Sequence, residues 1–475
     1  MCGIFGVANH KEASYLTYLG LHALQHRGEE ACGIASTNGQ VTLRQVANGL
    51  VDECFRKDHL MQLPGNLAIG HVRYSTSGGS LERNAQPLMV FNTPLGELAI
   101  AHNGNIPGYQ SLRSQMQKKG ALFYTDSDTE VLLVAIVQQL QKKLQSTRAV
   151  SASTLAKALA DALRPIEGAY SLLLLSRDFL IAVRDPWGVR PLAIGKLENS
   201  WVFSSETNAF DFVGATFLRE VKPGEIVIAA NGSKDLKSFF IVDQAQKVNP
   251  AACIFEMVYF ARPDSNIFGR DVYQARRAMG RVLAQEAPVA NADCVIAVPD
   301  SANVQALGYA EELGLPCEMG LVRSHYIGRT FIAPYQANRD FAAKLKYNPV
   351  RSLLEGKRIV VVDDSIVRGT TSKKLIRILR QLGGAKEVHF RVASPPMRWP
   401  CFYGIDMPTR KEFVATDKNI GEIKDFLDVD SLGYLSLEGM LKAAGASGGG
   451  FCTACFSGNY PIAQKTVEKL LKSKD

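Results

Sequence analysis

The sequence predicts a two-domain α/β protein, with two stacked β-sheets in the first domain and one parallel sheet in the second. Two observations favour this fold class. The first half alternates short β-like runs with turns, whereas the second half runs strand, loop, helix, strand. The length of 475 residues suits two or three domains, because one domain takes about 150 residues.

The β-like runs of the first half are short, apolar and bounded by turn residues, as buried strands are. They are Gly3–Ala8, Gly33–Thr37, Leu67–Val72, Ser171–Leu175, Phe179–Arg184 and Trp201–Ser204. Two helical patterns interrupt them, one with Leu16, Leu19 and Ala23 on one face and one over residues 129–144. This order predicts a β-rich layered structure with flanking helices.

The second half has the order of a parallel α/β domain. Strand-like residues 294–298 precede a helical stretch at 304–313, and strand-like residues 358–362 precede a helix at 372–382. A third strand is expected at 388–393. Because parallel strands need crossover connections, this order predicts a parallel sheet with helices packed on it.

The seam between the domains is expected where the hydrophobic period changes, between Ile228 and Val248. The polar stretch NGSKDLKS at 231–238 lies in this interval and is typical of a linker. We therefore predict one domain over residues 2–233 and a second over residues 234–475.

Charge and composition narrow the class of partner. The chain has 54 Lys and Arg against 46 Asp and Glu, so its net charge is +8, spread without a long basic block. This favours anionic small molecules over nucleic acid. No apolar run approaches the roughly 18 residues of a membrane helix, so no membrane partner is expected. The hydrophobic share of 46% excludes wholesale disorder.

The cysteines and the first residues bear on the compartment. Nine cysteines are too few for a disulfide scaffold in a chain of this length. The start MCGIFGVANH has neither the basic stretch nor the apolar stretch of a secretory signal. We therefore expect a cytoplasmic protein with reduced thiols.

Cys2 is the first candidate for chemistry. Removal of Met1 would leave Cys2 with a free α-amino group, whose unperturbed pKa is about 7.7–8.0. Such an amine acts as a base for the thiol of the same residue, so nucleophile and base need no distant histidine. By its position alone Cys2 also fits a small apolar residue that opens a strand.

Five spaced motifs favour the chemical interpretation: C-G-I-F-G at 2–6, L-Q-H-R-G at 24–28, H-V-R-Y-S-T at 71–76, A-H-N-G-N at 101–105 and T-D-S-D-T-E at 125–130. Together they resemble the class II glutamine amidotransferases, over about the first 230 residues. The resemblance implies an N-terminal-nucleophile (Ntn) hydrolase, a four-layer αββα sandwich whose mature N-terminal cysteine attacks the glutamine side-chain amide.

The same resemblance implies a role for each matched residue. Cys2 would be the nucleophile, Asn103 and Gly104 the oxyanion hole, Arg73 the partner of the glutamine α-carboxylate, and Asp128 the partner of its α-ammonium group. His26 and Arg27 would support the site. Each has a plainer interpretation: a surface ion pair for Arg73, a turn for Asn103 and Gly104, and a favourable first-turn helix residue for Asp128.

The motif R-I-V-V-V-D-D-S-I-V-R-G-T-T at 358–371 combines an apolar strand, two carboxylates and a helix start. Backbone N–H groups and hydroxyls at a helix start suit a phosphate. Asp363 and Asp364 would repel a bare phosphate, but they suit ribose hydroxyls or a Mg²⁺ ion that also binds pyrophosphate oxygens. The alternative is a strand-to-helix turn capped by acids.

This motif resembles the phosphoribosyl-diphosphate (PRPP) binding loop of the type I phosphoribosyltransferases, which implies an α/β fold with a parallel sheet. In V-P-D-S-A at 298–302, Ser301 would be a metal neighbour beside Asp363 and Asp364. In S-H-Y-I-G-R-T-F-I at 324–332, Arg329 would meet the pyrophosphate. The implied PRPP-binding residues are Arg329, Asp363, Asp364, Ser365, Arg368, Gly369, Thr370 and Thr371.

Cys452 and Cys455 have the spacing of a metal-ligand pair, and Cys253 and Cys401 complete a set of four. From spacing alone zinc and an iron–sulfur cluster both fit. The segments F-C-T-A-C-F-x-G-N-Y-P at 451–461 and P-C-F-Y-G-I-D at 400–406 resemble the iron–sulfur subclass of an enzyme family. That resemblance implies one structural [4Fe–4S] cluster.

The two halves together resemble the amidophosphoribosyltransferase family. This implies that ammonia released at Cys2 crosses to C1 of PRPP, giving 5-phosphoribosylamine, glutamate and pyrophosphate in the first committed step of purine biosynthesis. Feedback inhibition by purine nucleotides and a homotetramer are also implied. One alternative is another class II amidotransferase, which the motif at 358–371 argues against. The other is a regulatory PRPP- or nucleotide-binding homologue without catalysis, which would be expected to have lost Cys2, Arg73, Asn103 or an acidic residue.

Overall fold

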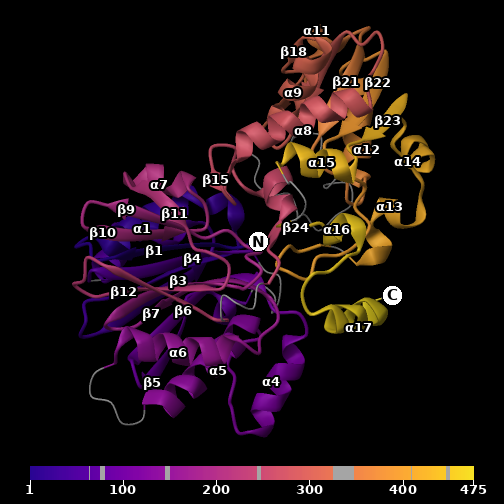
Figure 1. Ribbon diagram of the computed structural model, residues 1–475. Helices are drawn as coiled ribbons and strands as arrows, with labels where there is room; N and C mark the ends of the chain where they lie inside the picture. Colours follow the sequence, from indigo (N-terminus) through magenta and orange to yellow (C-terminus); the bar gives the residue numbers. More distant parts are fainter. Residues whose placement is uncertain are drawn as a thin grey trace.

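The computed structural model describes residues 1–63, 65–74, 81–144, 150–242, 248–324, 347–407, 409–445 and 450–474. The chain forms two bodies that meet along one side, and the N-terminus lies at their junction (Figure 1). No helix among these residues is long and apolar enough to cross a membrane.

The first body contains two antiparallel sheets. In order across the first sheet, its strands are β11 (Thr216–Glu220), β9 (Ala193–Leu197), β10 (Ser200–Ser204), β1 (Gly3–Ala8), β4 (Leu67–Arg73), β2 (Ala31–Thr37) and β3 (Thr42–Asn48). Those of the second sheet are β13 (Leu236–Phe240), β12 (Glu225–Ala230), β8 (Phe179–Arg184), β7 (Ala169–Leu175), β6 (Gly96–Asn105) and β5 (Leu88–Thr93).

Strand β7 shows how these sheets are layered. Leu172 and Leu174 pack in one apolar core with α5 (Asp128–Leu144) and α6 (Ala152–Leu163). Leu173 and Leu175 point the other way, into the core between the two sheets. The outer face of the first sheet packs against α1 (Ala13–Ala23) and α7 (Asn208–Val213). The predicted four-layer αββα sandwich is confirmed.

The second body is built on the predicted parallel sheet. Its strands, in order, are β18 (Cys317–Glu318), β17 (Cys294–Ala297), β21 (Arg358–Asp363), β22 (Glu387–Val392) and β23 (Ser431–Tyr434), and every pair is parallel. Val360 and Val362 of β21 face the core of α8 (Val272–Glu286) and α9 (Asn303–Leu313). Ile359 and Val361 face α12 (Thr370–Gln381) and α14 (Ile420–Leu427).

The polar stretch at 231–238 is a hairpin rather than a linker. Strand β13 pairs with β12 through a turn in which Gly232 has φ +76°. The second sheet therefore extends to Phe240, beyond the predicted boundary at residue 233, because a polar turn and a polar linker look alike in sequence. We propose that the first domain ends after residue 242.

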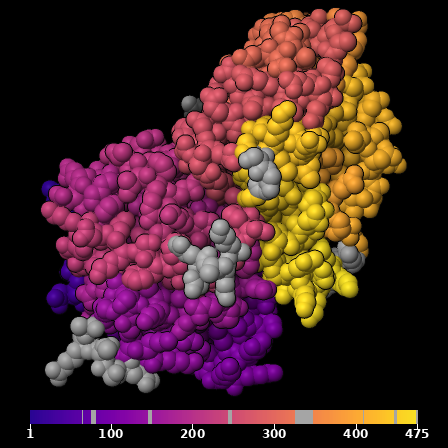
Figure 2. All heavy atoms as spheres, viewed as in Figure 1, coloured from indigo at the N-terminus to yellow at the C-terminus, as the bar shows by residue number. Residues whose placement is uncertain are grey.

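Residues from the end of the chain return to the junction of the two bodies. Strand β14 (Ala251–Cys253) pairs in parallel with β24 (Gly450–Cys452). The C-terminal residues, yellow in Figure 2, lie at the junction beside the first body. The junction is thus assembled from segments about two hundred residues apart, since β14 and β24 belong to opposite ends of the second half.

Candidate active site

Cys2 opens the central strand of the first sheet and is almost fully buried. Its Sγ–H lies 3.5 Å from the carbonyl oxygen of Tyr74. Its own carbonyl oxygen accepts a hydrogen bond of 2.9 Å from Nε of Arg27, which is fully buried. Arg27, which the sequence predicts to support the site, thus contacts the backbone of Cys2 directly.

A buried network of charges surrounds this contact. Arg27 binds the carboxylates of Glu206 and Glu256, and His26 lies 2.8 Å from Glu206. Burial alone would raise the pKa of Glu206, but His26 and Arg27 hold that pKa well below its usual value. The carboxylate is therefore ionised and holds Arg27 in place behind Cys2.

Arg190 joins this network from the connection between β8 and β9. Its guanidinium lies 3.4 Å from Glu256 and donates two hydrogen bonds, of 2.9 and 2.7 Å, to the carbonyl oxygen of Tyr403. None of the sequence motifs contains Arg190, Glu206 or Glu256. These residues lie far apart in the chain, and no local pattern marks a charge that is paired only after folding.

Asn103 and Gly104 lie at the end of β6, on the second sheet. Asn103 is fully buried, and neither its Oδ1 nor its Nδ2 has a hydrogen-bond partner in the part of the chain that the structure describes. A Cβ on Gly104 would overlap the Ala169 carbonyl oxygen, so only glycine fits there. The two residues are thus not a plain turn but the end of a strand, with an amide available to a ligand.

A hydrogen bond between the sheets aligns this strand end with the Arg73 strand. His71 of β4 donates from Nε2 to the carbonyl oxygen of His102 on β6, at 3.1 Å. Burial, followed by the nearby Arg73, lowers the pKa of His71 to about 3, so the ring is neutral at neutral pH. Gln86 supports the same strand by accepting from the His102 backbone N–H at 2.8 Å. His71 lies in the motif at 71–76 and His102 in the motif at 101–105, so the sequence motifs already marked both residues.

Arg73 and Asp128 are both buried near the same strand ends. Arg73 ends β4, and its burial excludes the surface ion pair. Asp128 is the first residue of α5, and its Oδ2 accepts a hydrogen bond of 2.9 Å from the backbone N–H of Ile106, just beyond β6. Its Oδ1 lies 3.9 Å from Nδ1 of His102. The carboxylate therefore reaches the strand that carries Asn103.

Asp363 and Asp364 end the central strand of the parallel sheet and are nearly fully buried. Burial and the neighbouring Asp364 raise the pKa of Asp363 well above its usual value. Burial also raises the pKa of Asp364, although hydrogen bonds from Ser301 and Ser365 oppose the shift. Two such carboxylates favour a cation between them.

The loop after the acidic pair ends in an open helix start. Gly369 has φ +72° and is the N-cap residue of α12, so it has no side chain with which to cap the first N–H groups of this helix. Thr370 and Thr371 are exposed in the first turn. The Arg368 side chain forms an ion pair with Glu412, with hydrogen bonds of 3.0 and 2.8 Å. Arg329, the predicted pyrophosphate contact, lies outside the described residues.

The four cysteines expected to bind a cluster come together at the junction. Cys253 and Cys452 are register partners in the β14–β24 pair. Burial, with the thiols of Cys253, Cys452 and Cys401, raises the pKa of Cys455 well above its usual value. Across the described ranges, no group of three or more His, Cys, Asp or Glu side chains is arranged to hold a single metal ion.

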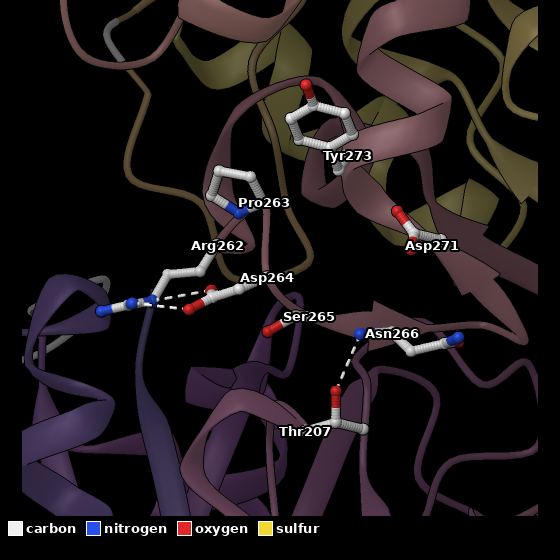
Figure 3. A pocket seen from close by; sticks show the side chains of 8 residues that line it. All are labelled: Thr207, Arg262, Pro263, Asp264, Ser265, Asn266, Asp271 and Tyr273. Carbon is white, nitrogen blue, oxygen red and sulfur yellow. Dashed lines mark hydrogen bonds and ion pairs between the residues drawn. The ribbon is translucent and has the colours of Figure 1, made fainter. Parts of the chain in front are cut away.

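A cavity of about 630 Å³ lies beside the junction and contains none of the predicted site residues (Figure 3). Its lining residues are Thr207, Arg262, Pro263, Asp264, Ser265, Asn266, Asp271 and Tyr273. Arg262 is paired with Asp264 across the wall. The Ser265 hydroxyl donates to Glu206 at 2.8 Å, so the cavity wall and Cys2 share one carboxylate network.

Comparisons with known proteins place these features in one family. Residues 71–212 match a family described as a glutamine amidotransferase domain. Amidophosphoribosyltransferase 1, chloroplastic, of Arabidopsis thaliana is 48% identical over 471 residues, 98% of this chain and 80% of the relative. Amidophosphoribosyltransferase of Bacillus subtilis is 44% identical over 472 residues, 98% of this chain and 95% of the relative.

A solved structure agrees over both bodies. The glutamine PRPP amidotransferase of Bacillus subtilis, complexed with ADP and GMP, aligns with a TM-score of 0.88 at 43% identity and covers 98% of each chain. The match therefore spans the sandwich, the parallel sheet and their junction. Identity near one half and a shared fold over nearly the whole length show that this chain belongs to the amidophosphoribosyltransferase family.

Proposed function

We propose that this amidophosphoribosyltransferase releases ammonia from glutamine at Cys2 and uses it at the acidic pair and phosphate loop of residues 363–371. The overall reaction converts glutamine, PRPP and water to 5-phosphoribosylamine, glutamate and pyrophosphate, the first committed step of purine biosynthesis. The observation that carries the assignment of sites is the contact of Cys2 with the second domain: its carbonyl oxygen accepts from Arg27, which in turn binds Glu256 of the second half.

At the glutamine site, the α-amine of a mature Cys2 takes the thiol proton, and the sulfur attacks the side-chain amide carbon. The carbonyl oxygen gains negative charge, which the Asn103 amide and the Gly104 N–H stabilise. The α-ammonium group of Cys2 then returns its proton to the amide nitrogen, and collapse of the intermediate expels ammonia and leaves a γ-glutamyl thioester, which water hydrolyses to glutamate. The buried, unpaired amide of Asn103 supports this role.

Arg73 and Asp128 fix the other end of glutamine. The guanidinium of Arg73 suits the α-carboxylate, because its planar donors match two oxygens. The Asp128 carboxylate suits the α-ammonium group. Their burial strengthens both interactions by excluding water, which also fixes the substrate amide relative to Cys2.

At the PRPP site, Asp363 and Asp364 would hold ribose hydroxyls and a Mg²⁺ ion, with Ser301 beside the ion. The raised pKa of both carboxylates supports this assignment, since a cation relieves their repulsion. Bound Mg²⁺ would neutralise charge on the departing pyrophosphate. The open start of α12, with Ser365, Gly369, Thr370, Thr371 and Arg368, would bind the 5-phosphate.

Cys253, Cys401, Cys452 and Cys455 would hold one [4Fe–4S] cluster, and the chain would then belong to the iron–sulfur subclass. Their convergence at a buried junction fits a cluster of four irons, whose ligands are more widely spaced than those of one ion. Such a cluster would serve as a cross-link between the end of the chain and two earlier segments.

Purine nucleotides are proposed feedback inhibitors that compete with PRPP at the phosphate loop. A solved relative binds ADP and GMP, which supports nucleotide binding. A kinetic pattern independent of PRPP concentration would contradict competition. A homotetramer and a cytoplasmic location remain proposals from the family resemblance, and the Arabidopsis relative is named as chloroplastic.

The test is glutamate release from glutamine by anaerobically purified protein, with and without PRPP and Mg²⁺. We expect strong stimulation by PRPP, with one pyrophosphate released for each glutamate. Glutamate release that does not change when PRPP is added would contradict the coupling of the two sites. No release from protein whose Met1 is shown to be absent would contradict the role of Cys2.

A further inference from the structure

The end of strand β6, which carries Asn103 and Gly104, is supported by the other domain. Strand β7 pairs with β6 up to Asn105. On the opposite side, the β5 pairing stops at Ile100. His71 and Gln86 contact His102 in this part of β6, and a short segment near Cys401 contacts the residues that follow.

Three consecutive residues of this segment, Phe402–Gly404, each contact the first domain. The Phe402 carbonyl oxygen accepts a hydrogen bond of 2.8 Å from Nδ2 of Asn105. The Tyr403 carbonyl oxygen accepts the two hydrogen bonds from Arg190. Gly404 packs on Gly104 so closely that a Cβ at position 404 would lie 3.0 Å from the Gly104 carbonyl carbon.

The C-terminal region holds the segment from its other side. The Tyr403 hydroxyl donates to the carbonyl oxygen of Ile462 at 2.7 Å. The backbone nitrogen of Tyr403 lies 3.3 Å from Sγ of Cys401. Arg190 also contacts Glu256, which binds Arg27 behind Cys2. The segment thus connects the nucleophile network with the strand end that carries the amide donors.

We propose that the Phe402–Gly404 segment positions the oxyanion-stabilising donors and that Gly404 is the positioning residue that fixes Gly104. This rests on the proposed role of Asn103 and Gly104. Gly404 has φ +112°, and a Cβ there would lie 3.0 to 3.2 Å from backbone atoms of Gly104, so the Gly104 backbone would have to shift to accept a side chain. A larger residue would displace the Gly104 N–H from the site of the developing charge.

The test substitutes Gly404→Ala and compares it with Gly356→Ala, a matched control. Gly356 also has a positive φ, +73°, but a Cβ there would meet nothing within 4 Å. We expect Gly404→Ala to lower kcat for glutamine hydrolysis by about 10- to 100-fold with little change in KM. Gly356→Ala should stay within about twofold of the parent enzyme.

Two further measurements separate positioning from a general structural role. Alkylation of Cys2 by iodoacetamide needs the thiolate but no oxyanion stabilisation, so Gly404→Ala should keep the parent rate. Synthesis of phosphoribosylamine from PRPP and added ammonia should also persist. Hydrolysis within twofold of the control, or equal losses in all three assays, would overturn the proposal.

Asn105→Ala is a milder test of the same contact, should Gly404→Ala fail to fold. It removes the donor to Phe402, and we expect a loss in kcat of about threefold to tenfold. Asn103→Ala separates this proposal from the one on which it rests. If Asn103→Ala hydrolyses glutamine normally, the oxyanion role of Asn103 is wrong. If Asn103→Ala is impaired but Gly404→Ala and Asn105→Ala hydrolyse glutamine normally, only the positioning role is wrong.

Discussion

Asn103 illustrates at the residue scale how the fold prepares a site before any ligand arrives. Its side-chain amide is fully buried and unpaired among the described residues, and an unpaired buried amide costs about 1–3 kcal/mol. Asp363 and Asp364 pose the same problem with charge, because burial raises the pKa of both. Both positions are destabilising alone, and the proposed binding of glutamine at Asn103 and of Mg²⁺ at the acidic pair would offset that cost.

Asp364→Asn tests the acidic pair. Removing one charge weakens the proposed hold on Mg²⁺ and ribose, so we expect PRPP-dependent pyrophosphate release to fall at least about 100-fold. Glutamate release without PRPP serves as the internal reference and should change little. Asp425→Asn is the control, since Asp425 is exposed in the same domain. Equal losses in both assays would indicate misfolding rather than lost PRPP chemistry.

At the scale of elements, apolar patterns predicted the strands well. Strand β1 has the predicted bounds, and the helix expected at 129–144 begins one residue earlier, at Asp128. These elements bury continuous apolar faces, which leave a clear period in the sequence. Strand β13 was missed because Leu236–Phe240 is a half-exposed edge strand behind a polar turn. Its place in the sheet depends on pairing with β12, and the local sequence pattern does not indicate that pairing.

The link between strands β4 and β6 predicts a pH dependence. The pKa of His71 is about 3, against an ordinary value of 6.5. Because the folded-state pKa is depressed, the stability contributed by neutral His71 is complete above 6.5 and is lost as the pH falls toward 3. Between about pH 6.5 and about pH 5, this amounts to roughly 2 kcal/mol.

Urea unfolding at a series of pH values measures this loss. His71→Gln keeps an N–H donor for the His102 carbonyl but cannot titrate, so its unfolding midpoint should depend less on pH. His59→Gln is the control, because His59 lies on the partly exposed short helix α3 (Lys57–Met61). Identical pH profiles for His71→Gln and the parent protein would contradict the assignment.

At the scale of the whole molecule, the two domains share a charged and cysteine-containing junction. The motifs predicted candidate residues for both sites, because these residues lie where a strand passes into a loop and are therefore close together in the sequence. The motifs did not predict Arg190, Glu206 or Glu256, whose charges are compensated only by partners from distant segments.

Cys455→Ser tests the proposed cluster. Loss of one ligand should remove iron and visible absorbance from anaerobically purified protein and lower the apparent Tm by roughly 5 °C or more, because the cross-link is lost. Cys317→Ser is the control, since Cys317 is exposed and distant in sequence from the cysteine set. Parent protein with neither iron nor zinc would contradict a metal centre at these cysteines.

The contact between Gly404 and Gly104 has a consequence for biosynthesis of the chain. A ribosome delivers the first domain long before residues 402–404, and domains fold as they emerge. The strand with the amide donors therefore stays incompletely supported until almost the entire polypeptide has been made. A nascent or truncated chain would keep its thiol but lack its full catalytic geometry. Under the proposed roles of Asn103 and Gly404, the order of synthesis would protect glutamine from hydrolysis by a chain that has no acceptor for the ammonia.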